Sequence, residues 1–284
     1  MDSMRQASTI DPAPSSGAGE HVLSLDHLTR RFGTNVAADA VTLDVDSGEV
    51  FGLLGPNGAG KSTTIKMLTT LLQPTSGTAT VAGFDLVRQA AQVRRVIGYV
   101  PQALSADGTL TGYENLLIFA RLYDLPRRAN ATRIREALAF MGLSEAADKL
   151  VRTYSGGMIR RLEVAQALLH EPRILFLDEP TVGLDPVARK AVWGHLHDIR
   201  AQTGMTIFLT THYMEEADSL CQRIAIMHHG RVATVGTPTE LKASLGQPDA
   251  TLDDVFAHYT GDVLETGGSY RDASRARRTA ARLG

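Results

Sequence analysis

The chain has 284 residues, 43% of them hydrophobic and 21% charged, which is typical of a globular protein and not of a disordered or fibrous one. Its net charge of -2 at pH 7 lacks the basic excess of a dedicated nucleic-acid-binding protein, and its single cysteine, Cys221, suits a reducing compartment. The apolar runs at residues 50–54 and 174–177 are far shorter than the ~18 residues of a membrane span, so we expect any membrane role to be peripheral.

The first ordered element is predicted at residue 21. Residues 1–20 are rich in Ser, Pro, Gly and Ala and lack the apolar region of a signal peptide, so we expect a disordered leader. An alternating apolar pattern after residue 21 predicts a strand, and a second pair of strands is predicted at residues 40–45 and 49–54, flanking the turn Asp46-Ser47-Gly48. The latter strand continues into a glycine-rich loop and a helix predicted from residue 60 to about 71.

Helical signals dominate the middle of the chain. Residues 110–150 have few strand signals and begin with a capping box formed by Thr111 and Glu114. Beyond Ser155, which is placed to cap a helix, apolar residues recur at helical spacing at positions 158, 162, 165 and 169. We therefore predict a helical lobe over about residues 103–170, inserted into an α/β core.

Strands and helices alternate again beyond residue 170. Strands are predicted at 174–177, 205–209 and 223–227, and a helix is predicted from Pro186 with Asp185 as its cap. This alternation indicates a parallel sheet and, with the lobe, a main domain over 21–245. Residues 246–268 are expected to form a small helical extension. Residues 269–284 carry five arginines against one aspartate, which favours a solvated disordered tail; contact with anionic lipid headgroups is the alternative.

The loop before the first predicted helix fits the phosphate-loop pattern G-x-x-x-x-G-K-[ST]. It reads Gly55-Pro56-Asn57-Gly58-Ala59-Gly60-Lys61-Ser62 and is followed by Thr63. Glycines let successive backbone N–H groups point at one anion, and the helix adds the positive end of its dipole. We expect Lys61 to reach the β and γ phosphates of a nucleotide and the Ser62 hydroxyl to ligate Mg²⁺. An ordinary glycine-rich turn is the alternative interpretation.

Two acids end the apolar strand at residues 174–177. A carboxylate at such a strand end is placed to hold Mg²⁺, and the next one to accept a proton from an attacking water. We assign Asp178 to the metal and Glu179 to the water. Alone, such a pair could simply cap the turn before Pro180.

The tripeptide Ser155-Gly156-Gly157 is weak evidence alone, but it lies at a predicted helix N-terminus that could bind a phosphate. It makes a second anion site. If the helical lobe holds this site away from the phosphate loop, one nucleotide cannot easily use both sites of one chain. A head-to-tail dimer would place each ATP between the phosphate loop of one chain and Ser155 of the other.

The order and spacing of these motifs resemble those of the ATP-binding cassette family, over about residues 23–236. The resemblance implies an α/β phosphate-loop NTPase core with a parallel sheet, an antiparallel β lobe and the helical lobe. It also implies roles for four further residues. Gln102 would touch Mg²⁺ and the attacking water, and His212 would contact the γ-phosphate. Asp185 would communicate across the dimer in addition to capping its helix. Phe32 would stack on adenine, where the family usually has a tyrosine.

The chain departs from the commonest family pattern beside the Ser155 motif, where Tyr154 and Met158 replace the more usual Leu and Gln. The sequence Tyr-Ser-Gly-Gly-Met, followed by two arginines, is similar to that of drug-exporter cassettes of the daunorubicin-resistance type. So is Leu252-Asp253-Asp254-Val255-Phe256, with Thr260-Gly261 after it. The resemblance thus favours a multidrug or antibiotic exporter.

We therefore expect a homodimer that hydrolyses ATP with Mg²⁺ on the cytoplasmic side of the cell membrane and drives separate integral membrane permease subunits. No nucleic acid partner is expected. The rival hypothesis is a soluble cassette ATPase that acts on nucleic acid or ribosomes, a class that usually has tandem cassettes or a long coiled coil. A phosphate-loop kinase is a third possibility, which would not explain Ser155-Gly156-Gly157 or His212.

Overall fold

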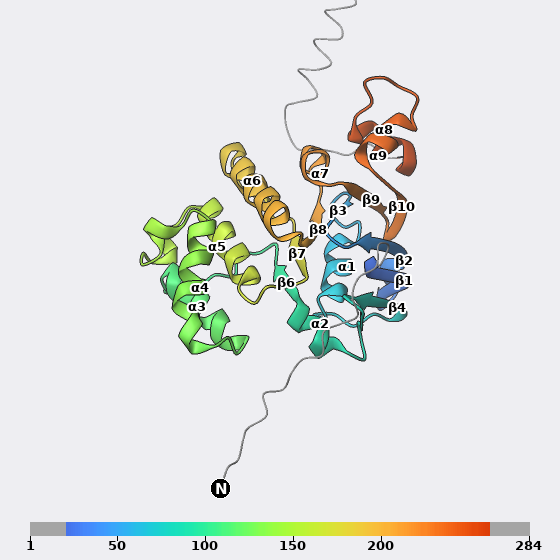
Figure 1. Ribbon diagram of the computed structural model, residues 1–284. Helices are drawn as coiled ribbons and strands as arrows, with labels where there is room; N and C mark the ends of the chain where they lie inside the picture. Colours follow the sequence, from blue (N-terminus) through green and yellow to red (C-terminus); the bar gives the residue numbers. More distant parts are fainter. Residues whose placement is uncertain (1–20, 262–284) are drawn as a thin grey trace, which may run out of the picture.

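The computed structural model describes residues 21–261, which form two sheets and a set of helices (Figure 1). The predicted leader, the basic tail and the end of the predicted extension lie outside the described residues. Within 21–261, no helix combines the length and the apolar composition needed to cross a membrane.

The larger sheet has six strands in the order β10-β9-β3-β8-β7-β6. Their bounds are β3 Val50–Leu54, β6 Ile97–Val100, β7 Ile174–Asp178, β8 Thr206–Thr211, β9 Arg223–His228 and β10 Arg231–Gly236. All neighbours are parallel except β10, which pairs antiparallel with β9. The carboxyl ends of β3, β8 and β7 therefore lie side by side, and the phosphate loop and the two acids follow two of these ends.

The smaller sheet is antiparallel, in the order β2-β1-β4-β5. Its strands are β1 His21–Phe32, β2 Asn35–Asp46, β4 Ser76–Val81 and β5 Phe84–Asp85. The two strands predicted at 40–45 and 49–54 are present but belong to different sheets: β2 pairs with β1, whereas β3 pairs with β8 and β9. Their burial explains the separation, because β3 is buried along its whole length and β2 is buried in alternation, as expected of a central parallel strand and an antiparallel strand.

The predicted helices are present, and their three predicted N-terminal caps are confirmed, whereas the helices at residues 90–96 and 214–220 were not predicted. The bounds are α1 Lys61–Leu68, α2 Ala90–Val96, α3 Gly112–Leu122, α4 Arg127–Phe140, α5 Gly156–Leu168, α6 Pro186–Thr203, α7 Met214–Leu220, α8 Pro238–Ala243 and α9 Leu252–Thr260. Thr111 and Glu114 form the capping box of α3, Ser155 caps α5, and Asp185 caps α6. Helix α1 ends earlier than predicted, because Thr70 adopts a left-handed conformation with φ 61°.

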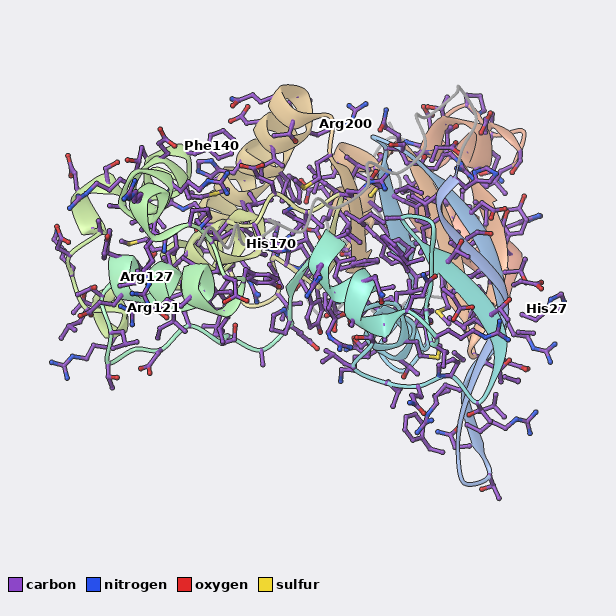
Figure 2. The ribbon with its side chains drawn as sticks, turned by 60° about the horizontal axis from the view of Figure 1, so that its bottom comes forward. His27, Arg121, Arg127, Phe140, His170 and Arg200 are labelled. Atoms are coloured by element: carbon purple, nitrogen blue, oxygen red, sulfur yellow. The ribbon has the colours of Figure 1, made fainter. Side chains whose placement is uncertain are left out.

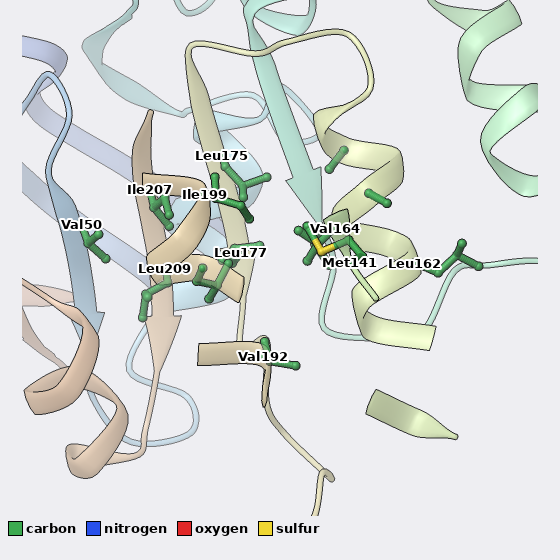
Figure 3. Packing of buried hydrophobic residues seen from close by; sticks show 14 of the residues in the cluster. Val50, Met141, Leu162, Val164, Leu175, Leu177, Val192, Ile199, Ile207 and Leu209 are labelled. Carbon is green, nitrogen blue, oxygen red and sulfur yellow. The ribbon is translucent and has the colours of Figure 1, made fainter. Parts of the chain in front are cut away.

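The six-stranded sheet separates two apolar cores. Alternate side chains of its strands point to opposite faces. One face packs against α1 and the antiparallel sheet, through residues such as Phe51, Phe176 and Phe208. The other packs against α5 and α6, as Figure 3 shows for residues of β7, β8, α5 and α6: Leu175, Leu177, Ile207, Leu209, Val164, Val192 and Ile199. Figure 2 shows His27 of β1 at one end of the molecule and Arg121 and Arg127 of the helical lobe at the other. The ends of the central strands thus lie between the two lobes.

Candidate functional site

The loop between β3 and α1 needs glycine at specific positions. Gly60, the N-cap of α1, has φ 106°, a conformation that side chains rarely adopt. A Cβ atom at Gly60 would collide with the backbone oxygen of Ala37, and one at Gly55 with that of Met227. The loop therefore passes so close to neighbouring backbone that only glycine fits at both positions.

Lys61 is the first residue of α1, and its side chain is only 4% exposed. Its ammonium group donates hydrogen bonds to the carbonyls of Gly55 at 2.8 Å and Pro56 at 3.0 Å. Burial lowers the pKa of Lys61, and the nearby Glu179 carboxylate opposes that effect. The ammonium is thus held against the loop that surrounds it.

Asp178 and Ser62 come together from elements that are far apart in the sequence. The Ser62 hydroxyl donates to Asp178 Oδ1 at 3.0 Å, and the buried hydroxyl of Thr210 donates to the same oxygen at 2.6 Å. Thr210 lies opposite Asp178 in the β7–β8 register. Thr210 was not predicted, because nothing in its local sequence marks a residue that buttresses an acid on the next strand.

Glu179 is buried and makes contact with three groups that the sequence analysis selected. Its Oε1 lies 3.1 Å from Lys61 Nζ. Its Oε2 lies 3.1 Å from His212 Nδ1 and accepts from Gln102 Nε2 at 3.3 Å. Burial alone would raise the pKa of Glu179, but hydrogen bonding to His212 and the charge of Lys61 together leave it below its usual value of 4.5. The carboxylate is therefore kept ionised and in place.

The backbone at Glu179 is strained. Its φ is 49°, the left-handed region that non-glycine residues seldom occupy. The conformation is held by two hydrogen bonds from its N–H, to the hydroxyl of Thr210 at 3.0 Å and to the carbonyl of Thr210 at 3.1 Å. Such strain is often found at functional sites.

A cleft of about 710 Å³ opens over the phosphate loop. Predicted residues that line it are Phe32, Asn57, Gly58, Gly60, Lys61, Ser62, Thr63, Gln102 and Glu179. The same cleft is lined by residues that were not predicted from the sequence: Asn35, Val36, Ala37, His229 and Gly230. The ring of Phe32 is part of this lining, and the Arg30 guanidinium lies 4.7 Å from the ring centroid.

The Ser155 motif and Asp185 do not line this cleft. Ser155 caps α5, its hydroxyl accepting from Met158 N at 3.3 Å. A Cβ atom on Gly157 would meet Ala188 at 3.0 Å, so the motif packs against the start of α6. Asp185 caps that helix by accepting from the N–H groups of Val187 and Ala188, both at 2.9 Å. These residues form a second, separate cluster around two helix N-termini.

The donors beside the phosphate loop fit a magnesium ion that is shared with a bound phosphate. Within residues 21–261 no group of three His, Cys, Asp or Glu side chains could hold a metal ion. The Ser62 hydroxyl and the Asp178 carboxylate do offer adjacent oxygens. Mg²⁺ typically takes one or two protein oxygens and completes its shell with phosphate oxygens and water, so the donor set suits a nucleotide-borne Mg²⁺.

The sequence matches the ABC transporter family over residues 38–182, more than half of the chain. A daunorubicin/doxorubicin resistance ATP-binding protein of Streptomyces peucetius is 48% identical over 219 residues, which are 77% of this chain and 66% of that protein. The chain thus spans slightly less than two thirds of this relative.

Two solved structures share the fold. The structure of an ATP-binding subunit of an ABC transporter gives a TM-score of 0.75 at 31% identity and covers 84% of this chain and 99% of that one. A dimeric ATP-binding cassette in a post-hydrolysis state, bound to ADP and Pi, gives a TM-score of 0.67 at 26% identity, with 76% and 98% covered. The predicted phosphate-loop NTPase fold is confirmed, and the chain belongs to the ABC transporter family.

Proposed function

We propose that this chain binds and hydrolyses Mg-ATP as a homodimer and drives drug export through separate membrane permease subunits. The observation that carries the proposal is the meeting of Lys61, Gln102 and His212 at the Glu179 carboxylate. These residues come from α1 and from the ends of β6 and β8, and they surround one reactive position beside the phosphate loop.

Nucleotide binding is assigned to the cleft over the phosphate loop. Backbone N–H groups within residues 57–63 would hold the phosphates at the positive end of α1, and Lys61 would exchange its contact with Glu179 for phosphate oxygens. The half-exposed Phe32 ring, 47% accessible, would stack on the adenine. Ser62, Asp178 and Gln102 would hold Mg²⁺, which supplies charge neutralisation at the phosphates when bound.

Hydrolysis is assigned to the Glu179 cluster. The ionised carboxylate of Glu179 is placed to accept a proton from an attacking water. Gln102 and His212 both contact Glu179 Oε2, so they would orient the carboxylate and the water, and His212 would also contact the γ-phosphate. The strained backbone of Glu179 fixes this arrangement before substrate arrives.

A homodimer would complete the site. The Ser155 motif and Asp185 lie outside the cleft of their own chain, at the N-termini of α5 and α6. Val187, beside Asp185, is a large apolar side chain that is 79% exposed, which suits a surface covered by a second subunit. Each ATP would then lie between the Lys61 loop of one chain and Ser155 of its partner.

Association with the cell membrane is assigned to the contact with the permease subunits. The apolar side chains of Ile118 and Leu122, one turn apart on α3, are exposed and suit contact with a permease on the cytoplasmic side. Drug export is supported by the relative named for daunorubicin and doxorubicin resistance. In the proposed division the cassette covers 21–245, with its helical lobe at about 103–170, and the C-terminal extension begins at 246.

The Lys61→Ala variant tests ATP binding at the phosphate loop. Its control is Lys66→Ala, which removes an exposed lysine from the same helix. Loss of a charged hydrogen bond of about 1.5–3 kcal/mol predicts roughly a 10- to 100-fold weaker affinity for ATP and no turnover. ATP binding and hydrolysis at the wild-type level in Lys61→Ala would refute the assignment.

Purification from a native membrane tests the transporter assignment. The chain should co-purify with a polytopic membrane protein, and ATP hydrolysis by that complex should increase in the presence of its exported compound. Quantitative recovery with nucleic acid or ribosomes, and with no polytopic protein, would contradict the proposal.

A further inference from the structure

Helix α5 carries a buried ion pair that no step above uses. Arg160 Nη1 lies 3.0 Å from Glu163 Oε2, and both side chains are only 2% exposed. Arg160 ranks first among the fully buried side chains of the described residues by volume. Each of the two charges loses several kcal/mol of hydration when it is buried. Hydrogen bonds to other groups must offset that cost, so the groups that they bind show which part of the chain the pair holds in place.

Those partners lie on one loop, residues 101–106, which we call the Gln102 loop. Arg160 donates to the carbonyl of Pro101 at 2.6 Å and to the carbonyl of Gln102 at 2.8 Å. Glu163 Oε1 accepts from the N–H of Ser105, from the hydroxyl of Ser105 at 3.1 Å and from the N–H of Ala106 at 3.3 Å. The positive charge therefore binds carbonyls at the start of the loop, and the negative charge binds N–H groups at its end.

The Gln102 loop is thus fixed at two places that belong to different parts of the molecule. Its backbone is bound to α5, whereas the Gln102 side chain donates to Glu179 Oε2 at 3.3 Å, at the end of β7. The N-terminus of α5 is Ser155. A displacement of α5 therefore moves the backbone of Gln102 relative to Glu179.

We propose that Arg160 and Glu163 are positioning residues that carry the position of α5 to Gln102, and through Gln102 to the Glu179 carboxylate. The inference rests on the proposed function, in which Ser155 binds the nucleotide held by the partner chain. In this arrangement Ser155 contacts the nucleotide of the partner chain. The ion pair, one to two turns further along α5, fixes the position of the Gln102 loop.

Three variants of the full-length chain test the inference. Arg160→Met removes both contacts to the loop carbonyls and replaces the guanidinium with a shorter, unbranched apolar side chain. Glu163→Gln keeps one acceptor oxygen but removes the charge. Arg160→Lys keeps the charge beside Glu163 but cannot reproduce the paired donation to Pro101 and Gln102. The control is Arg161→Met, because Arg161 is the next residue of α5 and donates to a carbonyl within the helical lobe, that of Met141 at 2.8 Å.

Hydrogen exchange of the nucleotide-free chain gives the first readout. In Arg160→Met, amides of residues 102–106 should exchange about tenfold faster or more, while those of the phosphate loop stay within about twofold of wild type. Arg161→Met should leave the exchange of residues 102–106 unchanged. Unaltered exchange of residues 102–106 in Arg160→Met would overturn the inference.

Steady-state ATP hydrolysis gives the second readout. For Arg160→Met and Glu163→Gln we expect kcat to fall about tenfold or more with the Kd for ATP within about twofold, because the phosphate loop is intact. Arg160→Lys should lie between these and wild type. If Arg160→Met does not fold, Arg160→Lys decides by the same two readouts. A wild-type value of kcat in a folded Arg160 variant refutes the inference. If the wild-type chain itself does not hydrolyse ATP, the proposed function is refuted, and the hydrogen-exchange measurement alone tests the role of the ion pair.

Discussion

We predict that Glu179→Gln separates ATP binding from ATP hydrolysis at this site. The substitution keeps the size of the side chain and an oxygen that can face Lys61 Nζ, now 3.1 Å from Oε1. It removes the negative charge and with it the proton acceptor. The backbone bonds from Glu179 N to Thr210 do not depend on the side chain, so the strained turn should persist.

The expected magnitude follows from the two roles of the carboxylate. Loss of a general base reduces turnover by about 10²-fold or more, equivalent to about 2.7 kcal/mol or more in the activation barrier. The affinity for ATP, in contrast, should not decrease. The carboxylate competes with phosphate for the Lys61 ammonium, so its neutralisation should leave the Kd for ATP unchanged or lower. The ATP that is not hydrolysed should then keep two chains associated.

Turnover, ATP affinity and mass by light scattering are measured on wild type, Glu179→Gln and Glu215→Gln. Glu215 is an exposed acid at the start of α7, so its variant controls for the loss of one negative charge. We expect a dimer that persists with Mg-ATP only in Glu179→Gln. Turnover close to wild type, or a loss of ATP affinity like that of Lys61→Ala, would refute the role of Glu179 as the base.

Three further predictions concern the residues around this carboxylate. Thr210→Val leaves Asp178 and Glu179 N without the hydroxyl and should lower the free energy of unfolding by about 1–3 kcal/mol in denaturant titrations. Phe32→Ala should weaken ATP binding about 2- to 10-fold while Phe32→Tyr keeps it, as measured by titration calorimetry. Because the pKa of Glu179 is lowered in the folded chain, its ionised contacts stabilise the fold above pH 4.5 and are lost as pH falls through the lower folded pKa. Wild type should therefore lose stability more steeply with acid than Glu179→Gln, and equal slopes would contradict the pKa direction.

Features that depend on residues close together in the sequence were predicted correctly. Thr111, Ser155 and Asp185 were identified as helix caps because capping depends on residues only two or three positions away, and the structure confirms each one. The phosphate loop was also recognised from a short segment of sequence. The close approach of its glycines to the backbone of Ala37 and Met227 was not predicted, because those residues are distant in the sequence.

Features that depend on long-range contacts were not predicted. Thr210 and the Arg160–Glu163 pair act on residues that are distant in the sequence, and nothing near them marks those partners. The separation of residues 40–45 and 49–54 into different sheets was not predicted for the same reason, because neighbouring segments joined by a short turn can belong to different sheets. His229 lines the cleft only because the β9–β10 turn lies beside the phosphate loop.

We propose that each ATP is bound by Lys61 of one chain and Ser155 of another, and a mixture of two defective chains tests this shared site. One chain carries Lys61→Ala and the other carries Ser155→Arg, both in a Glu179→Gln background that prevents turnover. Neither variant should associate with itself in Mg-ATP. Their mixture contains one heterodimeric site with an intact Lys61 and an intact Ser155, so it should form an ATP-dependent dimer.

The control mixture places both substitutions in one chain and pairs it with the Glu179→Gln chain. Every shared heterodimeric site then has one defective half, and no heterodimer should form beyond the homodimer of the Glu179→Gln chain. Light scattering of distinguishable, mass-tagged chains measures both mixtures. A heterodimer in the first mixture alone is the predicted result, whereas no association in the first mixture, or equal heterodimer in both, would contradict a site shared between chains.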